Sequence, residues 1–144
     1  MNETGQLASD LRVVIGHLIR RLRAERRDLS LSQITVLGQL DRGGPSTISK
    51  LASGERVRPQ SMASTVASLV AAGLAARTQD LADGRRVVIT LTAAGRAAVL
   101  ADRRRREGWL AEAIDRDLSA REQRVLAEAT ALLRRLADGG SSRR

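Results

Sequence analysis

The sequence has no cysteine, one histidine, one tryptophan, and neither phenylalanine nor tyrosine. The absence of cysteine excludes disulfides, thiolate metal sites and thiol-based redox sensing. A single histidine excludes metal sites built from histidine clusters, so we expect no metal and no cofactor. The near absence of aromatic rings argues against RNA-binding modules that stack bases on them. The core must therefore be built from leucine, valine, isoleucine and alanine.

Long apolar runs are also missing. No stretch reaches the roughly 18 apolar residues that a membrane-spanning helix requires. Residues 1–5 carry neither the basic nor the apolar region of a secretory signal, so we expect a cytoplasmic protein. The 144 residues suffice for one core with extensions, and the net charge of +9 favours a polyanionic partner. Nucleic acid and an anionic membrane surface are the two candidates.

Residues 46–92 are the stretch around which the chain is organised. Its patterns predict a helix over 46–52 with Ser46 as N-cap, a helix over 59–73, and strands over 74–78 and 87–91. Gly84 lies in the loop between the strands. This order of elements is typical of a winged helix-turn-helix, in which one helix binds a major groove and the loop, or wing, follows the DNA backbone. The predicted fold class is mainly α with a small β wing.

The second of these helices has a polar side with neither acidic nor large apolar residues. Short hydrogen-bonding side chains suit contacts to base edges and phosphates, and glutamine can pair with adenine. In the wing, arginines after Gly84 can bind a narrow minor groove, and an aspartate can hold an arginine in place by a charge-assisted hydrogen bond. The candidate DNA contacts are Arg58, Gln60, Ser61, Ser64, Thr65 and Ser68 on the helix and its turn, with Asp83, Arg85 and Arg86 in the wing.

The flanking segments read as long helices with wide apolar stripes. Capping boxes at Ser30/Gln33 and Ser119/Glu122 open two of the predicted helices, and Thr92 is the expected cap of a helix over 93–117. We predict that residues 1–28 and 93–138 form dimerisation helices around a DNA-binding domain of residues 29–92, with a disordered tail at 139–144. Four consecutive arginines, 103–106, are predicted to be solvated or paired between subunits.

Four motifs are spread over much of the chain. They are Leu29-Ser30-x-x-Gln33-x-x-x-Leu37-x-x-Leu40, Ile48-x-x-Leu51-Ala52, Leu69-x-x-x-Gly73-Leu74-x-x-Arg77 and Asp83-Gly84-Arg85-x-x-x-Ile89-x-Leu91-Thr92-x-x-Gly95. Together they resemble the MarR-type (multiple antibiotic resistance regulator) family. The resemblance implies a homodimeric transcriptional regulator, usually a repressor, that binds a palindromic operator in double-stranded DNA. It also adds Arg77 to the candidate DNA contacts.

Many members of this family are released from DNA by a small phenolic or lipophilic ligand bound between the dimerisation and DNA-binding parts. His17, Arg20 and Trp109 are the candidate lining residues here. The alternative for His17 is a packed or interface histidine, because large ligand pockets are few in any protein. The peroxide-sensing branch of the family depends on a cysteine, which this chain lacks.

Three other functions are compatible with parts of this sequence. A non-specific architectural or RNA-binding winged helix would share the charge without requiring a palindrome. An enzyme is disfavoured, because the sequence has no cysteine, one histidine and no nucleotide-binding glycine motif. Binding to a membrane surface is disfavoured because the basic residues accompany a wing rather than a simple amphipathic helix.

Overall fold

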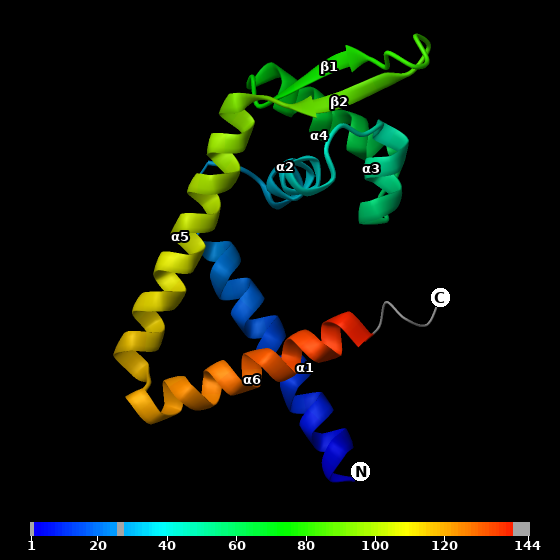
Figure 1. Cartoon of the computed structure of the whole chain (residues 1–144). Coiled ribbons are helices and arrows are strands. Elements are labelled where there is room, and N and C mark those ends of the chain that lie inside the picture. Colours follow the sequence, from blue (N-terminus) through cyan, green and yellow to red (C-terminus); the bar gives the residue numbers. More distant parts are fainter. Residues whose placement is uncertain (1, 26–27, 140–144) are drawn as a thin grey trace. The chain divides into compact units, whose positions relative to one another are not determined.

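The computed structural model describes residues 2–25 and 28–139. Within these residues the chain forms six helices and one two-stranded antiparallel sheet (Figure 1). The elements are α1 (Glu3–Ala24), α2 (Leu31–Gly43), α3 (Ile48–Glu55), α4 (Pro59–Ala71), β1 (Ala75–Gln79), β2 (Val87–Leu91), α5 (Ala93–Asp117) and α6 (Ala120–Gly139). The predicted fold class is confirmed. The chain divides into two compact units, Met1–Arg106 and Glu107–Arg144.

The core of the first unit lies between α2, α4, the sheet and the first turns of α5. Its fully buried side chains are aliphatic, as the composition requires. The buried apolar residues are Ile34, Val36, Leu37, Leu40, Leu51, Ala52, Met62, Val66, Leu69, Ala75, Ile89 and Val99. These residues come from every element of the winged helix, so the helix-turn-helix and the wing share one core.

Helix α2 begins at the predicted capping box. The Ser30 hydroxyl accepts from the Gln33 N–H at 3.1 Å, and the Gln33 side chain accepts from the Ser30 N–H at 2.9 Å. This is the expected capping box. The helix stops before Gly44, whose φ of 74° favours glycine.

Helix α3 corrects one prediction. Its N-cap is Thr47, whose hydroxyl accepts from the Lys50 N–H, and not Ser46. The backbone of Ser46 instead pairs with Ile89, donating its N–H at 3.0 Å and accepting at 2.7 Å. Ser46 therefore extends the sheet by one bridge, and the helix starts two residues later than predicted.

The wing strands pair from Ala75 opposite Leu91 to Gln79 opposite Val87. The first strand begins one residue later than predicted. The Leu74 N–H donates to the Leu69 carbonyl at 2.9 Å and so closes the end of α4 rather than entering the sheet. The second strand has the predicted bounds.

The arginine run at 103–106 is also corrected. Three of its members pair within the chain: Arg103 with Asp41 at 3.7 Å, Arg105 with Asp28 at 3.5 Å and Arg106 with Asp102 at 2.8 Å. Asp102 is buried, so its charge requires such a partner. Arg103 therefore links α5 to α2, and Arg105 links α5 to the segment before α2, all within the first unit.

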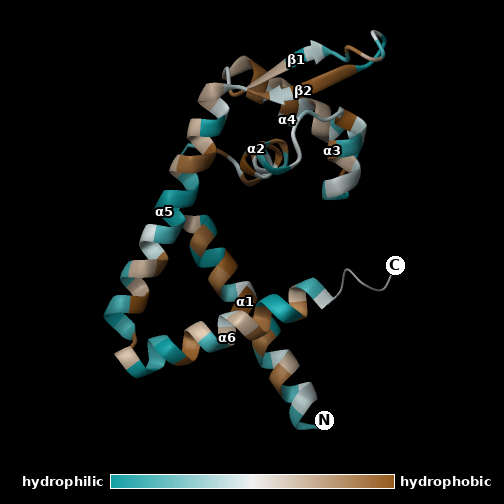
Figure 2. Ribbon diagram, viewed as in Figure 1, coloured by the Kyte–Doolittle hydropathy of each residue, from teal (hydrophilic) through white to brown (hydrophobic). Residues whose placement is uncertain are grey.

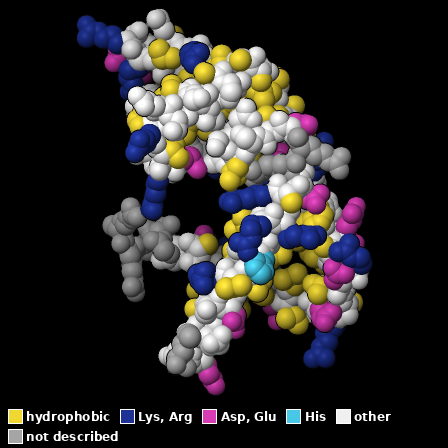
Figure 3. Space-filling model, turned by 180° about the vertical axis from the view of Figure 1, so that it is seen from behind, with side chains coloured by type: hydrophobic (Ala, Val, Ile, Leu, Met, Phe, Trp, Pro, Cys, Tyr) yellow, Lys and Arg dark blue, Asp and Glu magenta, His cyan; other side chains and the backbone are white. Residues whose placement is uncertain are grey.

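Helices α1 and α6 contain no buried residue. Apolar side chains nevertheless recur along both, as brown bands in Figure 2 and yellow patches in Figure 3. The Ser119/Glu122 capping box precedes α6 as predicted. In the described part of the chain, no helix has the length and apolar character to cross a membrane. Arg26, Arg27 and residues 140–144 of the predicted tail lie outside the described residues.

Candidate nucleic-acid interface

Helix α4 presents an open N-terminus. Pro59 occupies its first turn, and Arg58 at the N-cap makes no side-chain cap hydrogen bond. The first backbone N–H groups are therefore free to meet an anion, and the helix dipole favours negative charge there. Arg58 is exposed beside this end. Such a terminus suits a DNA phosphate.

The polar residues of α4 fall into two rows. Gln60 and Ser64 are one turn apart and exposed, on the side opposite the buried Met62 and Val66. They are the side chains of α4 best placed to meet base edges. A second row consists of Ser61, Thr65 and Ser68.

This second row faces α2. The Ser68 hydroxyl accepts from the Gln33 side chain at 3.1 Å and donates to the Thr65 carbonyl at 2.7 Å. Thr65 donates its own hydroxyl to the Ser61 carbonyl at 3.1 Å. Ser68 thus ties α4 to the capping box of α2, so its hydroxyl is already engaged inside the protein.

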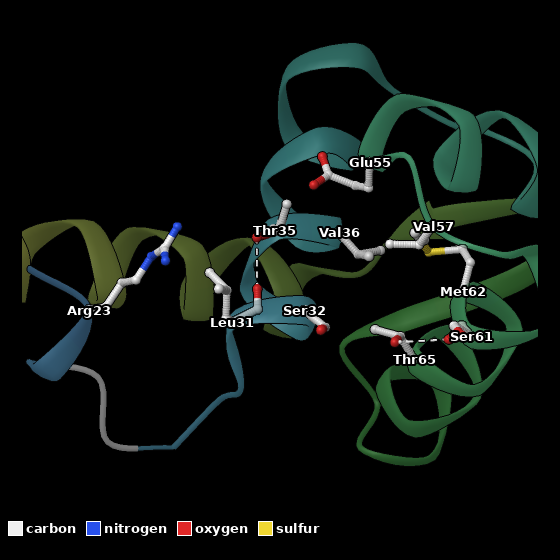
Figure 4. A pocket seen from close by; sticks show the side chains of 10 residues that line it. All are labelled: Arg23, Leu31, Ser32, Thr35, Val36, Glu55, Val57, Ser61, Met62 and Thr65. Carbon is white, nitrogen blue, oxygen red and sulfur yellow. Dashed lines mark hydrogen bonds between the residues drawn. The ribbon is translucent and has the colours of Figure 1, made fainter. Parts of the chain in front are cut away.

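Ser61 and Thr65 line a cavity of about 250 Å³ between α2, the end of α3 and α4 (Figure 4). Both apolar side chains and hydroxyl groups line it, and Arg23 and Glu55 add one charge of each sign. The lining residues are Arg23, Leu31, Ser32, Thr35, Val36, Glu55, Val57, Ser61, Met62 and Thr65. The size and the mixed walls suit a small, mainly apolar molecule.

The turn between α3 and α4 contributes a residue that the sequence analysis missed. Arg56 is exposed and holds a left-handed backbone, with φ of 54°. Its N–H donates to the carbonyls of Ala52 and Ser53, which closes α3. This conformation is uncommon for a side chain other than glycine or asparagine. Arg56 and Arg58 together make the turn before α4 basic; as the helix proposed to contact DNA bases, α4 is called the recognition helix below.

The wing loop uses its acidic side chains to hold its own backbone. The Asp80 carboxylate accepts from the Ala82 N–H at 3.0 Å, and the Asp83 carboxylate accepts from the Arg85 N–H at 3.1 Å. Asp83 therefore positions Arg85 through its main chain, and not through its guanidinium as predicted. Leu81, Arg85 and Arg86 are exposed on the loop.

A groove of about 440 Å³ runs between the start of α3 and the wing. Lys50 lines it from α3 and Arg86 from the wing, and Thr47 is also among its lining residues. Lys50 was not among the sequence-based candidates, because a lone exposed lysine has no distinguishing pattern. The groove brings together two cations from segments that are 36 residues apart in the sequence (86 − 50).

The remaining candidates are more scattered. Arg77 is exposed on β1, opposite Ile89. His17 and Arg20 are exposed on α1 in the first unit, and Trp109 is half-buried in the second unit. None of these three residues lines the cavity beside α4. The described residues contain no cluster of histidine and acidic side chains that could hold a metal ion.

Comparison with known proteins places this geometry in a family. The MarR family model matches residues 27–86. An HTH-type transcriptional regulator of Mycobacterium bovis is 37% identical, covering 96% of this chain and 97% of the relative, and one of Mycobacterium leprae is 36% identical over the same shares. A crystal structure of a putative transcriptional regulator from Pseudomonas aeruginosa has 38% identity and a TM-score of 0.85, covering 96% of this chain and 97% of the other.

A transcriptional regulator from Thermotoga maritima shares the fold at lower identity, with a TM-score of 0.82 at 21%. The members of the family are regulators that bind DNA, which disposes of the enzyme alternative. The chain belongs to the MarR family of winged helix-turn-helix transcriptional regulators.

Proposed function

We propose that the protein acts in the cytoplasm as a homodimeric repressor that binds a palindromic operator. One observation carries this proposal: the first and last helices, α1 and α6, contain no buried residue. Leu7 and Leu18 on α1 are 67% and 44% exposed, and Leu132 and Leu136 on α6 are 55% and 69% exposed. Apolar surface of this extent favours association with a second copy.

In this proposal residues 1–28 and 93–138 form the dimer, and residues 29–92 bind DNA. Two-fold symmetry then presents two α4 helices to half-sites about one turn of DNA apart, roughly 34 Å. Gln60 and Ser64 meet base edges in the major groove, and Arg85 enters the adjacent minor groove.

Recovery of genomic DNA tests this function. Fragmented genomic DNA is bound to the purified protein at about 0.15 M salt, and the recovered fragments are sequenced. We expect a few sites that share an inverted repeat. Uniform recovery of all fragments would support the alternative of a non-specific architectural protein. Light scattering of the same sample should give the mass of a dimer.

The cavity beside α4 supports release by an effector. Its apolar walls fit a small phenolic or lipophilic molecule, as do the hydroxyls of Ser32 and Ser61, which form no hydrogen bond among the described residues. A ligand there would press on the second polar row of the recognition helix. The site of His17, Arg20 and Trp109 is the alternative position for the same class of ligand.

Two variants separate these positions. Val57 is 43% exposed at the wall of the cavity, so Val57→Trp fills the cavity without disturbing the core. A panel of phenols and aromatic carboxylates is screened for an increase in melting temperature. An increase lost in Val57→Trp and kept in His17→Ala assigns the ligand to the cavity, and the opposite result assigns it to α1. No increase with any compound argues against a phenolic effector.

A further inference from the structure

Three elements of the winged helix meet at one residue, Thr92. Its backbone N–H donates to the Leu74 carbonyl at 3.2 Å. Its hydroxyl donates to the Gly73 carbonyl at 2.7 Å and accepts from the Gly95 N–H at 3.0 Å. One side chain therefore caps α5 and, at the same time, holds the residue that directly follows the C-cap of α4.

Gly95 brings the first turn of α5 against the same segment. A Cβ atom at this position would lie 2.0 Å from the Leu74 carbonyl oxygen and 2.7 Å from Leu91 Cδ1. The nearer contact is with backbone, so no rotamer change can relieve it. Only glycine allows α5 to lie this close to the start of the wing.

The joint made by Gly73, Leu74, Thr92 and Gly95 leaves no flexible linker. Gly73 has a φ of 74°, and the Leu74 N–H returns to α4 by donating to Leu69. Thr92 is the single residue between the end of β2 and the start of α5. The direction in which α5 leaves the winged helix is therefore fixed relative to the recognition helix.

The length of α5 makes this direction important. The part of α5 in the first unit, residues 93–106, spans about 21 Å. A tilt of roughly 10° at the base would move the end of this part by about 4 Å, which is about one base-pair step of roughly 3.4 Å. Small errors at the joint therefore become large errors in the separation of two half-sites.

We propose that Thr92 and Gly95 are positioning residues that set the spacing of the half-sites the dimer accepts. This inference rests on the proposed function, because it requires a dimer whose halves are connected through α5. Neither residue needs to touch DNA. The joint acts by holding the recognition helix at one angle to the helix that leads to the partner.

The test is selection from a random duplex library, which requires no known operator. Thr92→Val removes the hydroxyl at constant shape. Thr92→Asp keeps a good cap for α5 but offers no proton to the Gly73 carbonyl. Gly95→Ala forces the backbone apart. Thr92→Ser retains both hydrogen bonds, and Gly108→Ala is the matched glycine control on α5, since no atom lies within 4 Å of its added Cβ.

We expect the wild type, Thr92→Ser and Gly108→Ala to recover inverted repeats of one spacing. The other three variants should recover several spacings. Inserting one base pair between half-sites should weaken wild-type binding roughly tenfold but weaken Thr92→Val and Thr92→Asp binding less than about threefold. Affinity for an isolated half-site should stay within about twofold, and this distinguishes positioning from loss of the DNA contacts.

The inference is overturned if Thr92→Val and Thr92→Asp keep the wild-type spacing and lose affinity equally for every duplex as their melting temperatures fall. Thr92 is then only a helix cap. If Gly95→Ala does not fold, the two Thr92 variants decide. If the wild type itself recovers no paired half-sites, the proposed function fails and the inference fails with it.

Discussion

The winged helix and the two terminal helices, α1 and α6, contain the same types of aliphatic residue but differ in how far they bury them. Leu37 and Leu69 are completely buried, whereas Leu132 and Leu136 on α6 are more than half exposed. The winged helix surrounds its own core, and α1 and α6 contribute nothing to that core. Aliphatic content therefore does not indicate where the stability of a chain lies. One region buries its apolar side chains within the chain, and the other leaves them exposed. In the proposed dimer a second copy covers this exposed surface.

The largest expected effect tests this contrast directly. Leu37→Ala should lower the free energy of unfolding by about 2–5 kcal/mol, because it leaves a cavity in a packed core. Leu132→Ala should change the unfolding of the isolated chain by much less, and should instead raise the concentration at which dimers dissociate. Chemical denaturation and light scattering at several concentrations measure the two effects. Equal losses of folding stability would contradict the division into two regions.

A smaller effect concerns charge. Arg85→Ala should weaken operator binding by roughly 1–3 kcal/mol and make the salt dependence shallower by about one phosphate contact. Arg104→Ala is the matched control, since Arg104 is exposed and forms no ion pair among the described residues. Titration of a labelled duplex at several salt concentrations compares them. The same change in slope for both variants would mean that total charge, not the wing, determines affinity.

The cap of α3 gives an effect of about 1 kcal/mol. Thr47→Ala should destabilise the winged helix by that amount, because the Lys50 N–H loses its side-chain acceptor. Ser46→Ala is the control, since Ser46 acts through its backbone, which alanine retains. Thermal unfolding of both variants suffices. A larger loss of stability in Ser46→Ala than in Thr47→Ala would identify Ser46 as the N-cap of α3.

The smallest effect lies in the second unit. Hydrogen bonds from the Arg116 guanidinium at 2.9 and 3.0 Å lower the pKa of the Asp117 carboxyl below its ordinary value. A carboxyl with a lowered pKa stabilises the folded state above its ordinary pKa, and this contribution disappears as the pH falls through the lowered value. Because both side chains are exposed, the contribution is small.

Asp117→Asn should therefore lower the melting temperature slightly at about pH 7, and this difference should shrink as the pH is lowered below about 4. Asp115→Asn removes the same charge from the same helix, and Asp115 forms no ion pair among the described residues. A difference between Asp117→Asn and wild type that persists at low pH would show that the ion pair is not its cause.

Much of the fold follows from local sequence signals. Three features lie where the sequence predicts, and each depends on residues within one turn. They are the Ser30 capping box, the start of α4 at Pro59 and the cap at Thr92. Ser46 and Thr47 are equally good caps by type. The choice between them depends on the bridge to Ile89, which is 43 residues away (89 − 46), so local pattern could not decide it.

The candidate site was predictable by element but not by side-chain orientation. The sequence identified the polar face of α4, yet Ser68 turns its hydroxyl to Gln33 on α2. Arg56 and Lys50 were missed because the first depends on a left-handed turn and the second on a groove closed by the distant wing. The ion pairs of Arg103 and Arg105 were missed, because their acidic partners at 41 and 28 are distant in sequence.

The distribution of aromatic residues has a practical consequence for spectroscopy. Trp109 is the sole strong near-ultraviolet chromophore of the chain, and it lies in the second unit, outside the winged helix. The winged helix is therefore silent in intrinsic fluorescence. An emission change on mixing with DNA would report a change in the surroundings of Trp109 in the second unit. The protein thus carries a native optical probe of its second unit, and binding at the wing requires a label placed there.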